Sequence, residues 1–409
     1  ARLRVVVENS GLAIGGQEFR LEFASHDTAP SCEAVDEADY APVPPQASCG
    51  TSAVCMQTSN NVTDSASVAD LLVNAEGAFT AGEVREDPSN TTSAIDVDQN
   101  EYTELEYVIT PTSNVIDENL CFRVTDNGTF YDTYLQVAKM SLRFDPIVDS
   151  ITLNNGEAIS LLPGTTTAVV ATGTVTDLNG YTDLSHATGT FYRGGVVGGA
   201  SCAVDNNNCY SVGGSACTFT DCAGDSCTVS CQADIYFHAD PTDTGSAYDG
   251  EEWFAFLEVE DTGGGYDFGT SIGQELNTLR AIDIDGAIDY GSVAVTEDTG
   301  SVNATTSIEN QGNVEINIEV EGTDMTDGYS STIPSTKQKF ATSTFTYSGC
   351  GASCNLLSST TPVVLNVDLS KPTTTTPPVA DTVYWGIAVP FGVNSAPHQG
   401  QNVFTPVGP

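Results

Sequence analysis

The sequence predicts an all-β protein made of β-sandwich domains, on three observations. The composition is rich in Thr, Ser, Gly, Asn and Val and poor in Lys, Met and Trp, so residues that favour strands and turns outnumber strong helix formers. Apolar and polar residues alternate along many short segments, which is the pattern of half-buried strands. Turn sequences such as NNG, DNG and NQGN separate these segments. Many short strands with such punctuation are typical of β-sandwiches.

The alternation is clearest in residues 17–24, 313–322 and 362–370. In each segment every second residue is apolar, so one face of the strand can pack on a core while mostly polar residues face outward. The predicted inward-facing residues are Phe19, Leu21, Phe23, Val314, Ile316, Ile318, Val320, Val363, Leu365, Val367 and Leu369.

Two segments depart from this pattern. Residues 65–77 (SASVADLLVNAEG) are the best helix candidate. The low-complexity stretch SKPTTTTPPVADT, residues 370–382, is expected to be a loop with polyproline character rather than a linker. The reason is that VYWGIAVPF, which follows it, has the apolar content of a returning strand.

We expect three domains. A chain of 409 residues is long enough for each of them to bury a core. The first β-sandwich domain is predicted to span residues 1–145, the second residues 146–285, and the third residues 286–409. In the third, TTSIENQGNVEINIEVEG is typical of a strand, an asparagine-rich turn and a second strand at a sheet edge.

The charge balance limits the partners. The formal net charge is −43, from 55 acidic residues against 12 Lys and Arg. A surface this acidic repels nucleic acid and anionic membranes. It also suggests divalent-cation sites or a salty habitat, although a merely well-solvated acidic surface accounts for most of these carboxylates.

The ends of the chain suggest export. No apolar run approaches the roughly 20 residues that cross a bilayer. The chain opens on the strand-like RLRVVVEN without a signal peptide, as a mature chain does after export. Attachment to a cell would then be non-covalent, use a lost segment, or arise by self-assembly.

The cysteines predict disulfides. The stretch CTFTDCAGDSCTVSC, residues 217–231, has the spacing C-x4-C-x4-C-x3-C, whereas zinc sites use C-x2-C pairs and iron–sulfur sites use tighter spacings. Read as a hairpin that turns at Gly224 and Asp225, it places two nested cysteine pairs opposite each other. A metal site or other pairings remain the alternatives. By proximity, the expected pairs are Cys217–Cys231, Cys222–Cys227, Cys202–Cys209, Cys350–Cys354 and Cys49–Cys55, which leaves Cys32–Cys121. An even count of cysteines in an acidic, non-helical chain indicates oxidising surroundings.

Several segments carry a resemblance to a known group of proteins. They are FRLEFA, LCFRVTDNGTFYDTY, TVTDLNGYTDLSHATGTFYR, EEWFAFLEVED and QKFATSTFTYSGC with VYWGIAVP. Together they resemble immunoglobulin-like modules of large exported cell-surface proteins of candidate-phyla (patescibacterial) bacteria, over most of the chain. The resemblance implies three tandem immunoglobulin-like β-sandwich domains displayed outside the cell, and it implies no established activity.

The strongest candidate site is the turn TDLNGYTDL. Asp177, Asn179 and Asp183 place oxygen ligands at positions 1, 3 and 7 of a turn bent at Gly180. Calcium takes six to eight oxygen ligands, so we expect a structural calcium site between strands. The pattern is not an EF-hand, and an Asx-type turn with solvated carboxylates is the alternative. Nearby acidic loops offer further ligands, for example Asp243, Asp249 or Asp261.

No C-x-x-C-H motif is present, so haem is not expected, and neither is a nucleotide.

Catalytic motifs are weak. DTG occurs at Asp243, Asp261 and Asp298, and three copies within a short stretch indicate turns rather than an aspartic-protease pair. The GTSIG sequence at residues 269–273 lacks the strand–turn–helix context of a nucleophile elbow. The four histidines are scattered, and no spacing singles out a pair of glycosidase carboxylates.

Four asparagines, Asn61, Asn90, Asn127 and Asn303, lie in N-x-S/T sequons and are candidate glycosylation sites if the source glycosylates its surface proteins. Unmodified polar loops are the simpler interpretation.

These observations favour a non-enzymatic, extracellular or cell-surface protein. The first hypothesis is a structural subunit that assembles with itself through β-edges into a filament or surface layer, with the opening strand pairing late or across subunits. The alternative is an adhesin or an array of carbohydrate-binding modules that takes cell-surface glycans, which would need an exposed aromatic platform. Trp253 and Trp385 both lie in strand-like segments, where burial is the expectation.

Overall fold

The computed structural model describes residues 1–26, 31–72, 75–112, 119–131, 134, 136–141 and 143–409. They form two compact units. The first unit is Ala1–Asp145 with Leu178–Thr182, and the second is Pro146–Asp177 with Asp183–Pro409. The second unit is not divided further, so the boundary expected near residue 285 stays a prediction. Across the described residues the regular structure is strands and short 3-10 turns, which confirms the all-β prediction.

The first unit is a sandwich of two sheets around one core. One sheet has the order β1 (Arg2–Asn9), β8 (Glu101–Pro111) and β5 (Val54–Met56), with β6 (Ala78–Arg85) parallel to β8. The other has the order β10 (Ala138–Ser141), β9 (Asn119–Asp126), β3 (Phe19–Ser25) and β4 (Ala41–Pro42), and β2 (Ile14–Gln17) pairs with β7 (Ile95–Val97). Single 3-10 turns are η1 (Cys32–Ala34), η2 (Glu37–Asp39) and η3 (Gln46–Ser48). Alternate residues of β3, Phe19 and Leu21, are fully buried in this core, as the pattern predicts.

The helix expected over residues 65–77 is wrong for the described part, from which residues 73–74 are excluded. Ser67 forms an antiparallel bridge with Glu83 of β6, and Val68 N donates to Gly82 O at 3.0 Å. The segment therefore finds its backbone partners on β6. Pairing with a sheet edge overrides a helix propensity that is worth only tenths of a kcal/mol per residue.

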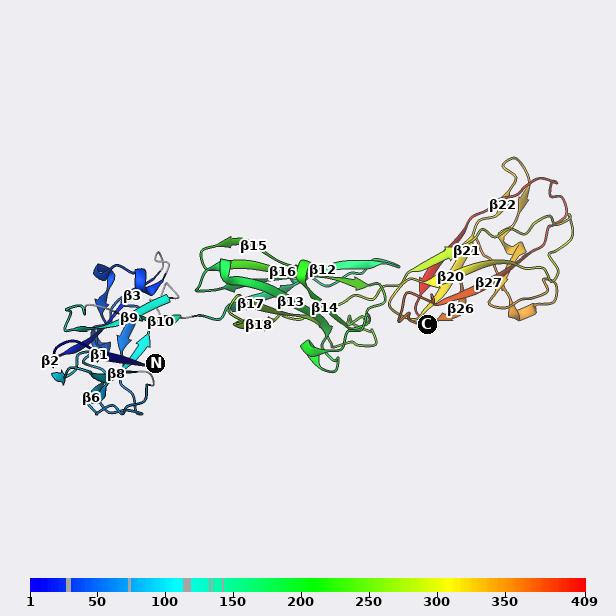
Figure 1. Cartoon of the computed structure of the whole chain (residues 1–409). Helices are drawn as coiled ribbons and strands as arrows, with labels where there is room; N and C mark the ends of the chain where they lie inside the picture. The colour runs from blue at the N-terminus through cyan, green and yellow to red at the C-terminus, as the bar shows by residue number, and fades with distance from the viewer. Residues whose placement is uncertain (27–30, 73–74, 113–118, 132–133, 135, 142) are drawn as a thin grey trace. The chain divides into compact units, whose positions relative to one another are not determined.

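The second unit begins with a sandwich of two facing four-stranded sheets. One sheet has the order β11 (Ile147–Leu153), β12 (Thr166–Thr176), β16 (Ser226–Tyr236) and β15 (Cys217–Ala223). The other has the order β14 (Cys209–Gly213), β13 (Leu184–Arg193), β17 (Trp253–Asp261) and β18 (Tyr266–Thr270). The 3-10 turns are η4 (Asn154–Gly156), η5 (Tyr181–Asp183), η6 (Gly199–Ser201) and η7 (Gly214–Ala216). Figure 1 shows these strands in green, and Trp253 is the largest side chain in their core.

A second sandwich completes this unit around a separate core that contains Trp385. One sheet has the order β19 (Ile282–Asp285), β20 (Ala304–Asn310), β27 (Ala380–Ile387), β24 (Gln338–Ala341) and β25 (Asn355–Leu356). The other has the order β26 (Val363–Leu369), β21 (Ile316–Gly322) and β28 (Asn402–Val407), and β22 (Met325–Thr326) pairs with β23 (Thr332–Ile333). The 3-10 turns are η8 (Ser335–Lys337) and η9 (Gly351–Ser353). Each pair of facing sheets encloses an apolar core and is therefore a β-sandwich.

The asparagine-rich segment between β20 and β21 is not a hairpin turn, because the two strands belong to different sheets. Asn310 stabilises the crossing with its side chain. Its Oδ1 accepts from Gly312 N at 2.9 Å, and its Nδ2 donates to Val314 O at 2.8 Å. The segment carries the chain from one sheet to the facing one.

Candidate metal centre

All twelve cysteines form disulfide bonds. The pairs are Cys32–Cys121, Cys49–Cys55, Cys202–Cys209, Cys217–Cys231, Cys222–Cys227 and Cys350–Cys354. These are the pairs that the spacing predicts. With every sulfur in a disulfide, the cysteines offer no thiolate to a metal ion.

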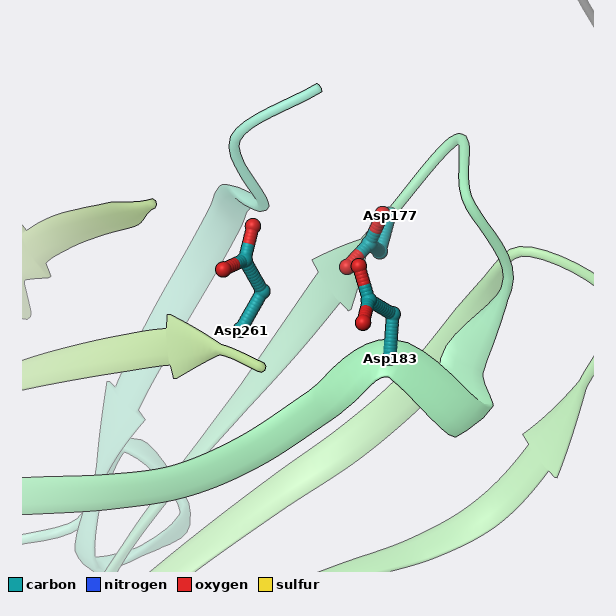
Figure 2. A group of neighbouring side chains, drawn as sticks. All are labelled: Asp177, Asp183 and Asp261. Atoms are coloured by element: carbon teal, nitrogen blue, oxygen red, sulfur yellow. The ribbon is translucent and has the colours of Figure 1, made fainter. Parts of the chain in front are cut away.

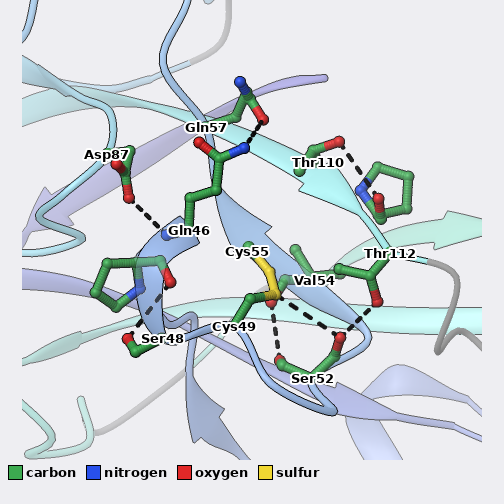
Figure 3. The surroundings of a disulfide bond; sticks show 12 residues. Gln46, Ser48, Cys49, Ser52, Val54, Cys55, Gln57, Asp87, Thr110 and Thr112 are labelled. Carbon is green, nitrogen blue, oxygen red and sulfur yellow. Dashed lines mark hydrogen bonds between the residues drawn. A yellow bond between two sulfur atoms is a disulfide. The ribbon is translucent and has the colours of Figure 1, made fainter.

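Short loops bring the closely spaced cysteines together. Figure 3 shows the loop closed by Cys49–Cys55, where Ser52 donates to Val54 O at 2.9 Å and Thr112 donates to Ser52 O at 2.6 Å. In the β15–β16 hairpin, Cys217 lies directly opposite Cys231 in the register, and Cys222 and Cys227 flank the turn. The hairpin is therefore bonded covalently at both its open end and its turn.

The turn of this hairpin lies beside a group of carboxylates. Asp225 O, in the turn, accepts a hydrogen bond from Asp177 N at 2.7 Å. One oxygen atom from each of Asp177, Asp183 and Asp261 lies within 4.8 Å of the others. Figure 2 shows the three side chains, and we call them the aspartate cluster. Asp177 follows β12, Asp183 closes the turn η5 before β13, and Asp261 is the last residue of β17.

Strand periodicity explains why two of these acids are buried. In β17 every second residue from Trp253 to Val259 is inward-facing, and Asp261 is the next member of that row. In β12 the inward row includes Val169 and Val175, and Asp177 follows at the same spacing. Asp177 is 0% exposed and Asp261 is 2% exposed. Since β12 and β17 belong to facing sheets, the aspartate cluster joins the two layers of the sandwich.

The hydrogen bonds of Asp261 leave one oxygen atom for a ligand. Its Oδ1 accepts from Gly263 N at 2.7 Å and from Gly265 N at 2.8 Å. Its Oδ2 is buried and has no hydrogen-bond partner among the described residues. A buried polar atom without a partner costs about 1–3 kcal/mol, and more when it is charged.

Asp183 is positioned by the loop that follows Asp261. Thr262 N donates to Asp183 O at 2.8 Å, and the Thr262 hydroxyl donates to Asp183 Oδ1. Two ionised carboxylates whose oxygen atoms lie within 4.8 Å of each other repel by about 3 kcal/mol or more at an effective dielectric constant of about 20. A cation would convert this repulsion into attraction.

The chemistry of the donor set fits a hard divalent cation. Each of the three carboxylates brings one oxygen atom to the cluster. Calcium takes six to eight oxygen atoms from carboxylates, carbonyls and water in a flexible geometry, so carbonyls and water would complete its shell here. Magnesium demands a near-ideal octahedron and keeps more of its water, so a set of converging carboxylates favours calcium.

The other predicted ligands have hydrogen-bond partners of their own. Asn179 Oδ1 accepts from Phe144 N at 2.8 Å. Asp243 Oδ1 accepts from the Thr278 hydroxyl at 2.6 Å, and Asp249 Oδ2 accepts from Gly245 N at 3.0 Å. The sequence predicts Asp261 only as one of three further calcium ligands, with Asp243 and Asp249. Its place at the end of the inward-facing row of β17 is the signal that distinguishes it from the other two.

The motifs with a formal catalytic match are turns and structural contacts. The aspartates of two DTG sequences accept from the glycine of their own motif, Asp261 from Gly263 and Asp298 from Gly300. Ser271 of the GTSIG sequence is buried, and its Oγ accepts from Ala255 N at 2.9 Å. Neither arrangement presents a nucleophile to a substrate.

The sequons divide into two kinds. Asn61 and Asn127 are exposed. Asn90 uses its amide nitrogen to donate to Leu21 O and Val43 O, and the amide nitrogen of Asn303 is buried. A glycan on the latter two would require the local structure to open.

Both tryptophans are core residues, with Trp253 1% and Trp385 0% exposed. Trp253 Nε1 donates to Asp240 O, and Trp385 Nε1 donates to the Thr306 hydroxyl. Neither can belong to an exposed aromatic platform.

No family model and no curated protein matches the chain. Among solved structures, a marsupial T cell receptor is 6% identical with a TM-score of 0.27, and the match covers 98% of this chain and 99% of that one. The major pilin subunit of Bacillus cereus is 7% identical with a TM-score of 0.19, over 100% of this chain and 96% of that one. A Salmonella alpha-2-macroglobulin is 9% identical with a TM-score of 0.16, over 98% and 23%. Likenesses this low transfer no function, and nothing among them supports the resemblance to candidate-phyla surface proteins.

Proposed function

We propose that this chain is a non-enzymatic, extracellular structural subunit that assembles with itself into a filament or surface layer. The observation that carries the proposal is an open strand edge on β1, in a chain otherwise stabilised by six disulfides. Disulfides of this density persist in oxidising surroundings outside the cytosol. In the described residues, no helix is long and apolar enough to span a bilayer.

Strand β1 pairs along its whole length with β8 of its own chain, from Arg2 opposite Val108 to Asn9 opposite Glu101. The expectation that this opening strand pairs across subunits is therefore not what the single chain shows, because β8 already supplies its partner. Within the described residues, β1 has no strand on its other side. A neighbouring subunit would therefore pair with the free edge of an existing sheet and not with an unpaired strand.

The backbone bonds decide which groups face this edge. The Ala1 amino group donates to Ile109 O at 2.6 Å, and Ile109 N donates to Ala1 O at 3.0 Å, so the two residues form a hydrogen-bonded pair. Such pairs alternate with non-hydrogen-bonded pairs along an antiparallel ladder. The backbone groups that point away from β8 are therefore those of Arg2, Arg4, Val6 and Glu8.

The side chains of β1 suit strand addition. Val5, Val6 and Val7 are β-branched and half-buried, and nothing in this run is a proline or a glycine. The Arg4 guanidinium forms ion pairs with Glu104, at 2.8 Å, and with Glu106. An edge without a proline, a bulge or an unpaired charge at its centre is a template for another strand.

A proline at one outward-facing position tests this proposal. Val6→Pro removes an N–H that faces the open edge and leaves the bonds to β8 in place, and proline is tolerated at such edge positions. The wild-type chain should form fibres or sheets by electron microscopy at high concentration in calcium, and Val6→Pro should stay monomeric. Val6→Thr, which keeps the N–H, is the matched control and should assemble.

Circular dichroism and thermal melting would establish that Val6→Pro folds. A wild-type chain that stays monomeric, or a Val6→Pro chain that assembles as well as the control, would overturn the proposal. The alternative role as an adhesin loses its main support, because both tryptophans are in the cores.

A further inference from the structure

Three loops of the second unit meet at an unusual set of polar side chains. Lys371 lies in the loop between β26 and β27, and Asn207 in the loop before β14. His238 and Asp240 follow β16. Lys371 Nζ lies 3.1 Å from Asn207 Oδ1 and 3.0 Å from Asp240 Oδ1. A lysine amine thus contacts both a primary amide and a carboxylate.

The orientation of the Asn207 amide is fixed by its nitrogen. Nδ2 donates to Asp205 Oδ1 at 2.8 Å and to Thr373 O at 3.1 Å, and both of these atoms can only accept. The carbonyl oxygen must therefore face Lys371. Asp240 N donates to Asn207 O at 2.8 Å, so the backbone also holds Asn207 and Asp240 side by side.

A ring nitrogen also approaches the carbonyl of Asn207. His238 Nδ1 lies 3.3 Å from Asn207 Oδ1, which can only accept, so the ring proton belongs on Nδ1. Burial, and then the Lys371 ammonium, lower the pKa of His238 from its ordinary value of 6.5, which keeps the ring neutral at neutral pH. The amide oxygen thus faces Lys371 and a ring N–H of His238, and the ring N–H would stabilise negative charge that develops on this oxygen when the lysine amine attacks.

The site is largely shielded from water. His238 is 1% exposed, and the Asp240 side chain is 5% exposed. Tyr236 stacks on the His238 ring and Phe237 packs against it edge-on. The second oxygen of Asp240 accepts from Arg193 Nε at 3.2 Å, which fixes the carboxylate with its other oxygen toward Lys371.

We propose that Lys371 and Asn207 form a covalent amide bond in the mature protein, with Asp240 as the proton acceptor. The residues present supply each role of an intramolecular acyl transfer: an amine nucleophile, an amide electrophile, a base, and a donor to the carbonyl oxygen. Lys371 Nζ lies 3.1 Å from the oxygen of the carbonyl group that it would attack, so the nucleophile and the electrophile are already held beside each other.

The atoms balance without a cofactor or oxidant. Asp240 takes one proton from the Lys371 ammonium, and the neutral amine attacks Asn207 Cγ. The bond from Cγ to Nδ2 breaks as a second lysine proton moves to that nitrogen. Ammonia leaves with the proton that Asp240 held, as ammonium. An ammonium and a primary amide become a secondary amide and an ammonium.

The bond would tie a loop of the last sandwich to the preceding one. Lys371 follows β26, whereas Asn207, His238 and Asp240 belong to the sandwich built on β12 and β17. The inference is independent of whether the chain assembles, because every participant belongs to a single chain.

Mass spectrometry of the full-length chain tests the proposal. After reduction of the disulfides, the wild-type chain should weigh less than its sequence by one ammonia. A protease digest should contain one branched peptide that joins Asn207 to Lys371. Separate peptides that carry an unmodified Lys371 and an unmodified Asn207 would overturn the proposal.

Variants test the individual roles. Lys371→Arg and Asn207→Ala should restore the full sequence mass, and Asp240→Asn should abolish or strongly slow the mass loss. Asn206→Ala is the matched control, since it keeps the carbonyl that accepts from the Tyr210 hydroxyl, and it should retain the bond. Mapping of the six disulfides would establish that each variant is folded. An Asp240→Asn chain that loses ammonia as completely as wild type would exclude Asp240 as the base.

Discussion

At the scale of the residue, the informative groups are polar side chains in positions that the strand pattern reserves for apolar ones. Asp177 and Asp261 continue inward rows of valines and leucines, so the fold buries them. Burial of a carboxylate without sufficient partners is unfavourable, which is why such residues mark sites that bind something.

The aspartate cluster gives a prediction whose sign depends on calcium. Asp261→Asn removes one of three mutually repelling carboxylates, so in calcium-free buffer this variant should be at least as stable as wild type. With calcium at about 100 times the dissociation constant, wild type should gain about 3 kcal/mol in its free energy of unfolding, and Asp261→Asn should gain far less. Chemical denaturation with and without a chelator measures both.

An exposed carboxylate supplies the control for this experiment. Asp285→Asn in β19 removes the same charge outside the aspartate cluster and should respond to calcium as wild type does. Equal calcium responses of Asp261→Asn and wild type would exclude the aspartate cluster as the binding site.

At the scale of the element, disulfides hold an exposed edge strand that buries little apolar surface in the core. The β15–β16 hairpin has an exposed strand, β15, at the edge of its sheet, and two disulfides hold that strand to β16. No side chain of its turn belongs to the aspartate cluster. The carbonyl of Asp225 in the turn accepts a hydrogen bond from Asp177 N, so the hairpin also helps to position Asp177.

The disulfides should differ in their contribution to stability according to the loops they close. Cys32–Cys121 spans 89 residues and Cys222–Cys227 spans 5. In the chain-entropy model these loops are worth about 5 and about 2 kcal/mol. We expect the double alanine variant of the first pair to lose more than twice the free energy of unfolding lost by that of the second. Urea denaturation of both variants, with the remaining disulfides verified, measures the difference. Equal losses would show that native-state packing, rather than loop closure, sets their effect.

At the scale of the whole molecule, charge opposes association. A net charge of −43 makes copies of the chain repel each other unless ions screen the charge or bind to it. The edge of β1 supplies directional bonds, but these act only at contact distance.

Assembly should therefore depend steeply on ionic strength. Raising NaCl from about 0.01 M to about 1 M shortens the screening length from about 30 Å to about 3 Å. The concentration at which wild type assembles should fall over this range, as followed by light scattering, and Val6→Pro should not respond. An assembly that weakens as salt is added would instead indicate contacts between opposite charges.

The sequence by itself determined the all-β class, the inward rows of the strands and the cysteine pairs. The strand class, the inward rows and five of the six cysteine pairs follow from local rules: a period of two along a strand, and short loops that keep two sulfurs close. Cys32–Cys121 spans 89 residues and was predicted only as the pair left over. The same rules failed where partners are distant in the chain. Residues 65–68 form backbone hydrogen bonds with β6 instead of starting a helix, and the segment after Asn310 crosses between sheets instead of turning back.

Only the tertiary structure shows which residues come together in the two candidate sites, the aspartate cluster and the group of Lys371, Asn207 and Asp240. Asp261 joins Asp177 and Asp183 because β12 and β17 end, and β13 begins, at the same end of two facing sheets, and no spacing along the chain contains that fact. Lys371 came from a stretch whose composition indicated nothing more than a loop, and it lies 164 residues from Asn207 in the sequence. Chemistry of this kind depends on atoms within about 3 Å of each other, and in a β-sandwich that proximity is set by sheet packing rather than by position in the chain.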